Sequence, residues 1–251
     1  MELISIITPY YKKKKFIREA VLSAIKQTYK KLEIIIVYDD QNLEDLKYIE
    51  AIVSLDDRIS LIVNNKNIGA GLSRNLAIRS SRGTYIAFLD ADDIWKENKI
   101  EEQINFMKKN DSKICHTSYE IIDYNRNIIG KRVARNFKEI KDLLKSCDIG
   151  LSTVMMKKIF FSNECSFVNL RTKEDFIFWL MLLKQNHAIE ALDVNLSYWR
   201  KLNDSLSSSS IQKLTDGFKV YYKYMNFSLI KSVIYLALLS FNYILKELKN
   251  K

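Results

Sequence analysis

Three aspartates, Asp90, Asp92 and Asp93, fall within four positions directly after the apolar run Tyr85–Leu89. Their charges repel one another unless a divalent cation such as Mg2+ or Mn2+ lies between them, and such a cation also bridges to phosphate oxygens of a ligand. The chain has two histidines, so carboxylates must hold any metal. The alternative is a solvated loop in which Asp92 or Asp93 caps the following helix.

A second acidic segment, Asp39 and Asp40, follows the run Glu33–Tyr38, which is mainly apolar. The carboxyl ends of parallel strands open onto one crevice, so both acidic segments are expected to face the same ligand. A carboxylate here can accept hydrogen bonds from a nucleotide base or ribose. The alternative is a turn that leads into a helix cap.

The segment Asn67–Ala77 lies between the two acidic segments, with Gly69 and Gly71 ahead of a helical pattern and Arg74 in its first turn. A helix N-terminus that carries an arginine favours phosphate groups. The alternative is a turn with an ordinary surface arginine. The GxxxxGK[ST] pattern of a phosphate-binding P-loop is absent.

Apolar runs alternate with amphipathic helical patterns through about residue 110, which predicts an α/β fold with a mostly parallel, twisted sheet flanked by helices. The expected strands are 3–7, 33–38, 59–63 and 84–89, and the expected helices are 16–27, 43–53, 70–80 and about 96–109. The extended run 114–122, a polar turn at 123–127 and a second short run predict an antiparallel edge. Beyond residue 172 the pattern is mainly helical apart from 188–199, and the serine-rich segment 205–210 predicts a loop.

The length of 251 residues and a hydrophobic content of 47% fit one large domain with extensions. We expect a domain at 1–217, made of a ligand-binding part at 1–110 and a second part at 111–217, with a helical extension at 218–251. The net charge of +10 favours an anionic partner. Three widely spaced cysteines and an N-terminus without the features of a secretory signal predict a cytoplasmic protein.

Four segments, in this order, resemble the family 2 inverting glycosyltransferases, which have the GT-A fold. They are Thr8–Tyr11, Glu33–Asp40, Asn67–Asn75 and Leu89–Trp95. The resemblance implies a nucleotide-sugar donor, expected to be a UDP-sugar, and a Mn2+ or Mg2+ ion held mainly by Asp92. The donor-binding residues it implies in this half are Pro9, Tyr11, Asp39, Asp40, Asn67, Gly69, Arg74, Asp90, Ala91 and Asp92.

One departure from the family pattern concerns the base-binding carboxylate. The family usually has two aspartates directly after the valine of the second strand, whereas Tyr38 intervenes here. Asp39 is our choice for the residue that contacts uracil, and Asp40 is the alternative. Asp90 is expected to reach the ribose or the metal.

In the second half, Arg171–Trp179 resembles the acidic pair that begins a helix beside the acceptor. By that resemblance Asp175 is the general base, and Glu174 and Trp179 lie on the acceptor side. The alternative for the two acids is a favourable interaction with the helix dipole. The segment 198–207 resembles the family loop whose arginine approaches the diphosphate, which assigns that role to Arg200. The histidine often found there is absent, and Lys201 substitutes for it only in part.

The C-terminal segment 218–251 has six lysines, one glutamate and a charge-free stretch at 232–245. That stretch is too short to span a bilayer, which needs about twenty residues. An amphipathic helix on the inner membrane surface fits the lysines and aromatic residues. A helix packed on the catalytic domain, or on the partner in a homodimer, is the alternative.

These inferences predict a metal-dependent inverting glycosyltransferase that acts on a saccharide or lipid-linked glycan acceptor in surface polysaccharide biosynthesis. A nucleotidyltransferase is a second candidate, but its glycine-rich N-terminal signature is missing, because the first glycine is Gly69. A basic nucleic-acid-binding module is a third. Its lysines are dispersed without a recognised motif, so no nucleic acid partner is expected.

Overall fold

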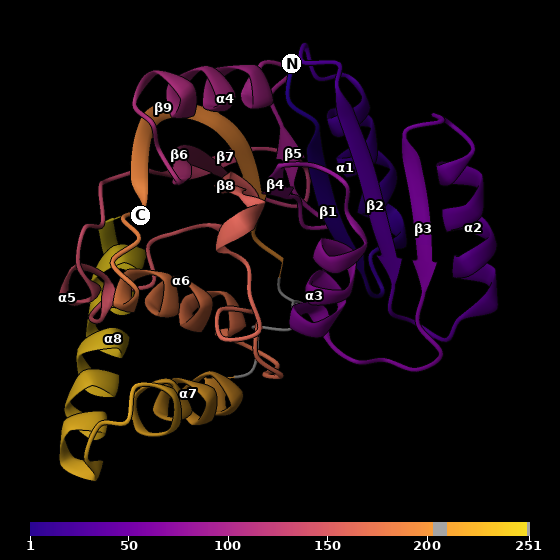
Figure 1. Cartoon of the computed structure of the whole chain (residues 1–251). Coiled ribbons are helices and arrows are strands. Elements are labelled where there is room, and N and C mark those ends of the chain that lie inside the picture. The colour runs from indigo at the N-terminus through magenta and orange to yellow at the C-terminus, as the bar shows by residue number, and fades with distance from the viewer. Residues whose placement is uncertain (203–209, 250–251) are drawn as a thin grey trace.

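A computed structural model describes residues 1–202 and 210–249. Most of the serine-rich segment expected to form a loop lies outside the described residues. In the described part, nine strands form one sheet in the order β3-β2-β1-β4-β8-β6-β9-β5, with β7 paired to β6. Helices cover the sheet (Figure 1). The predicted α/β class with a flanked, mostly parallel N-terminal sheet is confirmed.

The first half alternates strands and helices, as the sequence predicts. Its elements are β1 (Ile4–Tyr10), α1 (Lys14–Ile25), β2 (Leu32–Tyr38), α2 (Leu43–Val53), β3 (Ile59–Val63), α3 (Ala70–Ser80) and β4 (Tyr85–Phe88). Strands β1 to β4 are parallel. Both faces of β1 and β2 are buried, which explains their continuous apolar runs. β1 continues to Tyr10, three residues beyond the expected strand.

The second half extends this sheet with shorter pieces. They are β5 (Ile94–Trp95), α4 (Lys99–Lys109), β6 (Ile114–Ile122), β7 (Ile128–Arg132), α5 (Ile140–Leu143), η1 (Leu151–Thr153), β8 (Met155–Lys157), η2 (Lys158–Phe160), α6 (Glu174–Lys184) and β9 (Glu190–Arg200). The predicted antiparallel edge forms as the β6–β7 hairpin. β8 joins the parallel part to β6 in antiparallel fashion, whereas β6 and β9 run parallel.

The core has two clusters, because alternate residues of a strand point to opposite faces. Ile4 and Ile6 of β1 pack with α1, α2 and α4, and Ile7 packs with α3 and α6. Helix α6 is buried almost all round, from Phe176 through Leu180. Packing on all sides therefore holds α6 in place near the carboxyl edge of the sheet.

The C-terminal helices lie beyond α6 from the sheet (Figure 1). They are α7 (Ser210–Lys219), the π-helical turn η3 (Val220–Tyr224) and α8 (Leu229–Lys249). The division expected after residue 217 falls inside the continuous α7–η3 helix. Val220, Tyr221 and Leu239 are buried in the same cluster as α6, so this extension is packed on the rest of the chain.

Candidate active site

The acidic loop after β4 lies at the carboxyl edge of the sheet, and its three aspartates have different partners. Asp90 Oδ1 accepts a hydrogen bond from Arg74 Nη2 at 2.7 Å. Asp92 Oδ2 lies 2.7 Å from Lys13 Nζ. Asp93 is buried and accepts hydrogen bonds from Ser152 Oγ at 2.6 Å and the backbone N–H of Arg200 at 2.9 Å. Burial, together with the two neighbouring aspartates, raises the pKa of Asp93 well above its usual range.

Arg74 joins the acidic loop to the start of α6. Its side chain is 5% exposed, and Nη1 donates to Glu174 Oε1 at 2.9 Å while Nη2 donates to Asp90. Its Nε has no hydrogen-bond partner in the described part of the chain. Both terminal nitrogens of Arg74 are directed at carboxylates, and its expected contact with a phosphate stays a prediction.

The acidic pair expected from the sequence begins α6. Asp175 Oδ1 accepts the backbone N–H of Phe176 at 2.7 Å. Burial raises the pKa of Asp175, and the cations Lys173 and Arg74 oppose that rise. Burial and the adjacent Asp175 raise the pKa of Glu174 to about 7. A raised carboxyl pKa is typical of a group that exchanges a proton near neutral pH.

Trp179 requires a correction. It was expected on the acceptor side, but its side chain is fully buried and packs edge to face against Phe88 and Phe167. Because α6 is apolar on all sides, its sequence does not show which residue faces outward. Trp179 belongs to the core that holds α6 in place.

Asp39 organises the loop before α3. Its Oδ1 accepts hydrogen bonds from Asn64 Nδ2 at 2.8 Å and the backbone N–H of Ile68 at 2.9 Å, and Oδ2 accepts the Gly69 N–H at 2.8 Å. Asn67 Nδ2 donates to the Asp39 carbonyl at 2.7 Å. Asp39, the preferred base-binding residue, therefore forms hydrogen bonds within the chain, and Asn67 and Gly69 are among its partners.

The two glycines of this loop are required by geometry. Gly69 has a φ of 89°, in the region that side chains disfavour. A Cβ on Gly71 would lie 2.8 Å from the Val168 carbonyl oxygen, so glycine lets α3 approach the segment that precedes α6. The loop is followed by the helix that carries Arg74, whose guanidinium lies between Asp90 and Glu174.

Asp40 lies beside the end of β1 and is also buried. Its Oδ1 accepts the backbone N–H of Gln41 at 2.7 Å and its Oδ2 that of Lys12 at 3.2 Å. Asp40 also lines a pocket of about 340 Å3 whose wall includes the lysines 12–15. Pro9 and Ala91 are buried near this edge, and Tyr11 is half-buried. The four lysines were not predicted as site residues, although their unbroken run one residue after the first strand was a visible signal.

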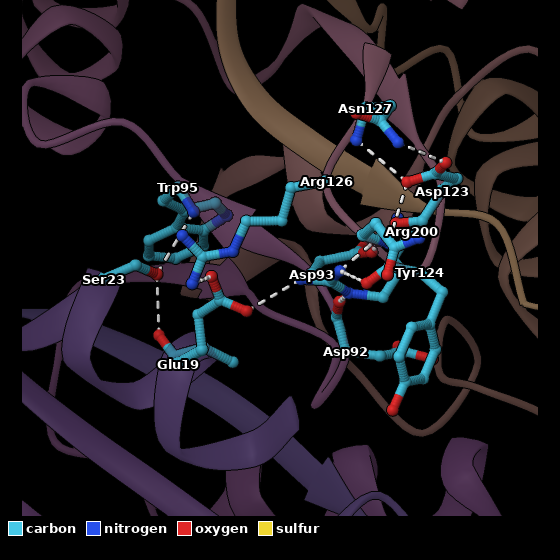
Figure 2. Close-up of polar contacts among 12 residues, drawn as sticks. Glu19, Ser23, Asp92, Asp93, Trp95, Asp123, Tyr124, Arg126, Asn127 and Arg200 are labelled. Carbon is cyan, nitrogen blue, oxygen red and sulfur yellow. Dashed lines mark hydrogen bonds and ion pairs between the residues drawn. The ribbon is translucent and has the colours of Figure 1, made fainter. Parts of the chain in front are cut away.

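Arg200 is the centre of a clamp rather than an open phosphate contact (Figure 2). Its side chain is 1% exposed. Nε donates to the Asp92 carbonyl at 3.0 Å, Nη2 donates to Glu19 Oε2 at 2.8 Å, and Nη1 donates to the carbonyls of residues 123 and 124. These acceptors take up the donors of Arg200 in this structure, and its expected role toward the diphosphate stays a prediction. The clamp ties the acidic loop to α1 and to the β6–β7 turn.

The residues present fit a divalent cation only in part. Across residues 1–202 and 210–249, no three acidic, histidine or cysteine side chains converge into a metal site. Asp92 is nevertheless paired with a lysine ammonium, which shows that the loop accommodates a positive charge there. Mg2+ is commonly held by one or two carboxylates plus phosphate oxygens of a substrate. The donor set therefore fits a cation that a diphosphate helps to bind.

The sheet order, the acidic loop at its carboxyl edge and the acidic pair on α6 together define a GT-A glycosyltransferase. The model of glycosyl transferase family 2 matches residues 5–162, and the chain belongs to this family. It is accordingly a glycosyltransferase, which decides against both the nucleotidyltransferase and the nucleic-acid-binding alternatives.

Two curated relatives are similar over most of their length. The chain is 38% identical over 214 residues to UDP-Glc:alpha-D-GlcNAc-diphosphoundecaprenol beta-1,3-glucosyltransferase WfgD of Escherichia coli, covering 84% of this chain and 82% of that one. It is 32% identical over 208 residues to the putative teichuronic acid biosynthesis glycosyltransferase TuaG of Bacillus subtilis, covering 82% of each.

Solved structures share the fold. TarS 1–349 of S. aureus in complex with UDP-GlcNAc matches with a TM-score of 0.68 and 21% identity, over 88% of this chain and 64% of that chain. This chain thus spans less than two thirds of the TarS fragment. The mannosyltransferase PcManGT of Pyrobaculum calidifontis, in complex with GDP-Man and Mn2+, matches with a TM-score of 0.69 and 12% identity over 93% and 69%.

Proposed function

We propose that this enzyme transfers a sugar from a UDP-sugar to a lipid-linked saccharide and inverts the anomeric configuration. The observation that carries the proposal is the Arg74 bridge, which joins Asp90 of the acidic loop to Glu174 of α6. Transfer of a sugar between two substrates requires the protein groups that bind the donor and those that bind the acceptor to lie next to each other. The relatives add chemistry, since the name of WfgD specifies a UDP-glucose donor and a diphosphoundecaprenol-linked acceptor.

On the acceptor side, Asp175 is proposed as the general base. Its carboxylate removes the proton of the acceptor hydroxyl as that oxygen forms its bond to the anomeric carbon. The bond from this carbon to the diphosphate oxygen breaks on the opposite face, which releases the nucleoside diphosphate. A single displacement of this kind gives a β-linked product from an α-linked donor. Glu174, held by Arg74, orients the start of α6.

On the donor side, we assign the base contact to Asp40, because Asp40 lines the pocket, whereas Asp39 accepts three hydrogen bonds from the loop 64–69. Lysines 12–15 line the same pocket and supply positive charge for the diphosphate. Asp92 is the residue that would hold Mn2+ or Mg2+. When bound, such an ion neutralises negative charge on the departing diphosphate.

A donor screen tests the proposal. UDP-glucose, UDP-GlcNAc and GDP-mannose are incubated with Mn2+ or with a chelator, with and without a diphospholipid-linked GlcNAc acceptor, and nucleotide release is measured. We expect acceptor-stimulated, metal-dependent release of UDP, and a β-anomeric proton signal in the product. Preference for GDP-mannose, or full activity in chelator, would contradict the donor or the metal assignment respectively.

We also propose that α8 lies on the inner surface of the membrane that contains the acceptor. Over residues 229–246, α8 is long and apolar enough to cross a membrane by length and composition, with 11% of that window buried. Its outward face carries an apolar stripe, formed by Ile230, Val233, Ile234, Phe241, Ile244 and Leu248, which are each more than half exposed. Residues 217–246 contain lysines but no acidic residue, which favours an anionic lipid surface.

The opposite face of α8 is attached to the protein. Leu239 is buried in the core, and Asn242 Nδ2 donates to the Lys145 carbonyl at 2.9 Å. A helix held along one face cannot be surrounded by lipid, so the structure favours a helix lying in the interface over a spanning one. The proposed contact is therefore peripheral.

Co-sedimentation with phosphatidylglycerol vesicles tests the membrane contact. The triple variant Ile230→Ser, Ile234→Ser and Phe241→Ser is preferable to a truncation, because removing α8 would also uncover the core around Leu239. We expect the variant to lose vesicle binding, and Ile159→Ser, which removes an 81% exposed side chain elsewhere, to retain it. A concentration-dependent dimer that the triple variant abolishes, without vesicle binding by the parent, would assign the stripe to a second copy of the chain.

A further inference from the structure

Lys13 forms an ion pair with Asp92, the residue of the acidic loop that is proposed to hold the metal. Its Nζ lies 2.7 Å from Asp92 Oδ2, and both side chains are largely buried, with 18% and 17% exposed. Asp90 and Asp93 have other partners in Arg74, Ser152 and Arg200. Asp92 is thus the acid of this loop whose charge is balanced by a side chain on a flexible stem.

The backbone holds Lys13 in this position. Lys12 has a φ of 52°, a left-handed conformation that costs free energy in residues other than glycine and occurs preferentially at functional sites. The Lys12 N–H donates to Asp40 Oδ2, and the Lys13 carbonyl accepts the N–H groups of Phe16 and Ile17 at the start of α1. The chain is therefore fixed on both sides of Lys13, which lines the pocket and forms an ion pair with Asp92.

We propose that Lys13 is an internal counterion that competes with the divalent cation for Asp92 and makes metal binding depend on the nucleotide. Without a nucleotide, the ammonium neutralises Asp92 and disfavours a second positive charge. A nucleoside diphosphate brings two phosphates into the pocket lined by lysines 12–15. Lys13 then turns to the phosphates, and Asp92 becomes free for the metal. This inference rests on the proposed donor site and adds the order of binding.

The competition follows from electrostatics at short range. A divalent cation and an ammonium a few ångströms apart repel far more strongly in a protein than in bulk water, because the effective dielectric constant there is lower. Reorganisation of a lysine stem relieves part of that repulsion, because the stem has several rotatable bonds. Hence the metal and the ammonium are not expected to share Asp92, and removal of the ammonium is expected to strengthen metal binding in the absence of nucleotide.

Electron paramagnetic resonance titration of Mn2+ tests the proposal on the whole chain, with and without UDP. We expect the parent to bind Mn2+ weakly alone and at least about tenfold more tightly with UDP, which corresponds to about 1.4 kcal/mol. Lys13→Met should bind Mn2+ alone about tenfold more tightly than the parent, and should bind UDP more weakly in chelator. Lys13→Arg, which keeps the charge, should still exclude the metal.

Lys14→Met is the matched control, because Lys14 belongs to the same lysine run but pairs with Asp45 at 2.9 Å. It should leave the affinity for Mn2+ alone unchanged. The gain in Lys13→Met should disappear when Asp92→Asn is added. Equal affinity of the parent and Lys13→Met for Mn2+ alone would overturn the inference, even where UDP binds normally. Absence of UDP binding by the parent would instead contradict the donor site, and the metal-alone comparison would still decide the role of Lys13.

Discussion

Replacement of Arg74 by methionine probes the bridge between the donor and acceptor sides. The change keeps an unbranched apolar stem but removes the guanidinium from Asp90 and Glu174. The Asp90 side chain is 30% exposed and can be hydrated, whereas that of Glu174 is 12% exposed. The larger part of the loss is therefore expected at Glu174.

The magnitude depends on pH, because Glu174 can escape its burial by taking up a proton. In the parent its pKa is raised to about 7 from 4.5, so the folded state binds more protons than the unfolded state and stability falls as pH rises through this window. Loss of Arg74, which lowers this pKa, extends that fall to higher pH. Removing one partner of a buried charge pair costs about 3 to 5 kcal/mol when the other stays charged. We expect a loss of this size near pH 8.5, smaller by about 1.4 kcal/mol for each pH unit down to about pH 7.

Urea unfolding of the parent and Arg74→Met at about pH 6, 7 and 8.5 measures the effect. Arg79→Met is the matched control, since Arg79 is an exposed arginine on the same helix, and it should change stability by less than about 1 kcal/mol at every pH. In a Glu174→Gln background the penalty of Arg74→Met should shrink. A penalty that is independent of pH, or below about 1 kcal/mol throughout, would refute the assignment of a buried bridge.

Three further outcomes are expected. Asp175→Asn should lower turnover by about a hundred- to ten-thousand-fold with little change in the affinities for UDP and metal, and Glu174→Gln should have a smaller effect. Steady-state rates and nucleotide titrations measure both variants, and a larger effect of Glu174→Gln would assign the general base to Glu174. Asp92→Asn should abolish the metal dependence of UDP binding in calorimetry; unchanged dependence in a folded variant would remove Asp92 from the site. Burial lowers the pKa of Lys99 to about 7. Lys99→Met should therefore stabilise the protein most below pH 7 and lose that gain as pH rises toward the ordinary lysine pKa of about 10.4. Urea unfolding measures the difference, and a difference that is constant with pH would show that Lys99 does not titrate in this range.

The elements were predictable because local patterns determine them. Helix α3 runs from Ala70 to Ser80 and β3 from Ile59 to Val63, as expected from periodicity and from the glycine before the helix. The expected helix 16–27 is displaced to Lys14–Ile25. Its start is set by backbone hydrogen bonds to the Lys13 carbonyl, and no capping side chain marks that position in the sequence.

The partners of the site residues were not predictable, because they come from distant parts of the chain. Arg74 bonds Glu174, a hundred positions away, and Arg200 bonds Glu19, 181 positions away. Asp39 and Asp40 are equivalent in a strand-end pattern, and only the position of the loop 64–69 shows that Asp39 is occupied. A sequence indicates which charges meet at one edge of a sheet, but the pairing of those charges depends on tertiary packing.

The two arginines and the lysines 12–15 carry the positive charge of the site on groups with different chemistry. A guanidinium offers five donors in a fixed plane, which suits Arg74 between two carboxylates and Arg200 among acceptors from α1, the acidic loop and the β6–β7 turn. A lysine ammonium ends a flexible stem and can change partners, which suits Lys13 between Asp92 and a phosphate. Arginine to lysine changes at 74 or 200 are therefore not conservative, because one ammonium cannot reach both partners of the bridge. By the same reasoning, the two arginines hold the elements of this site together, whereas Lys13 can change its partner when the substrate binds.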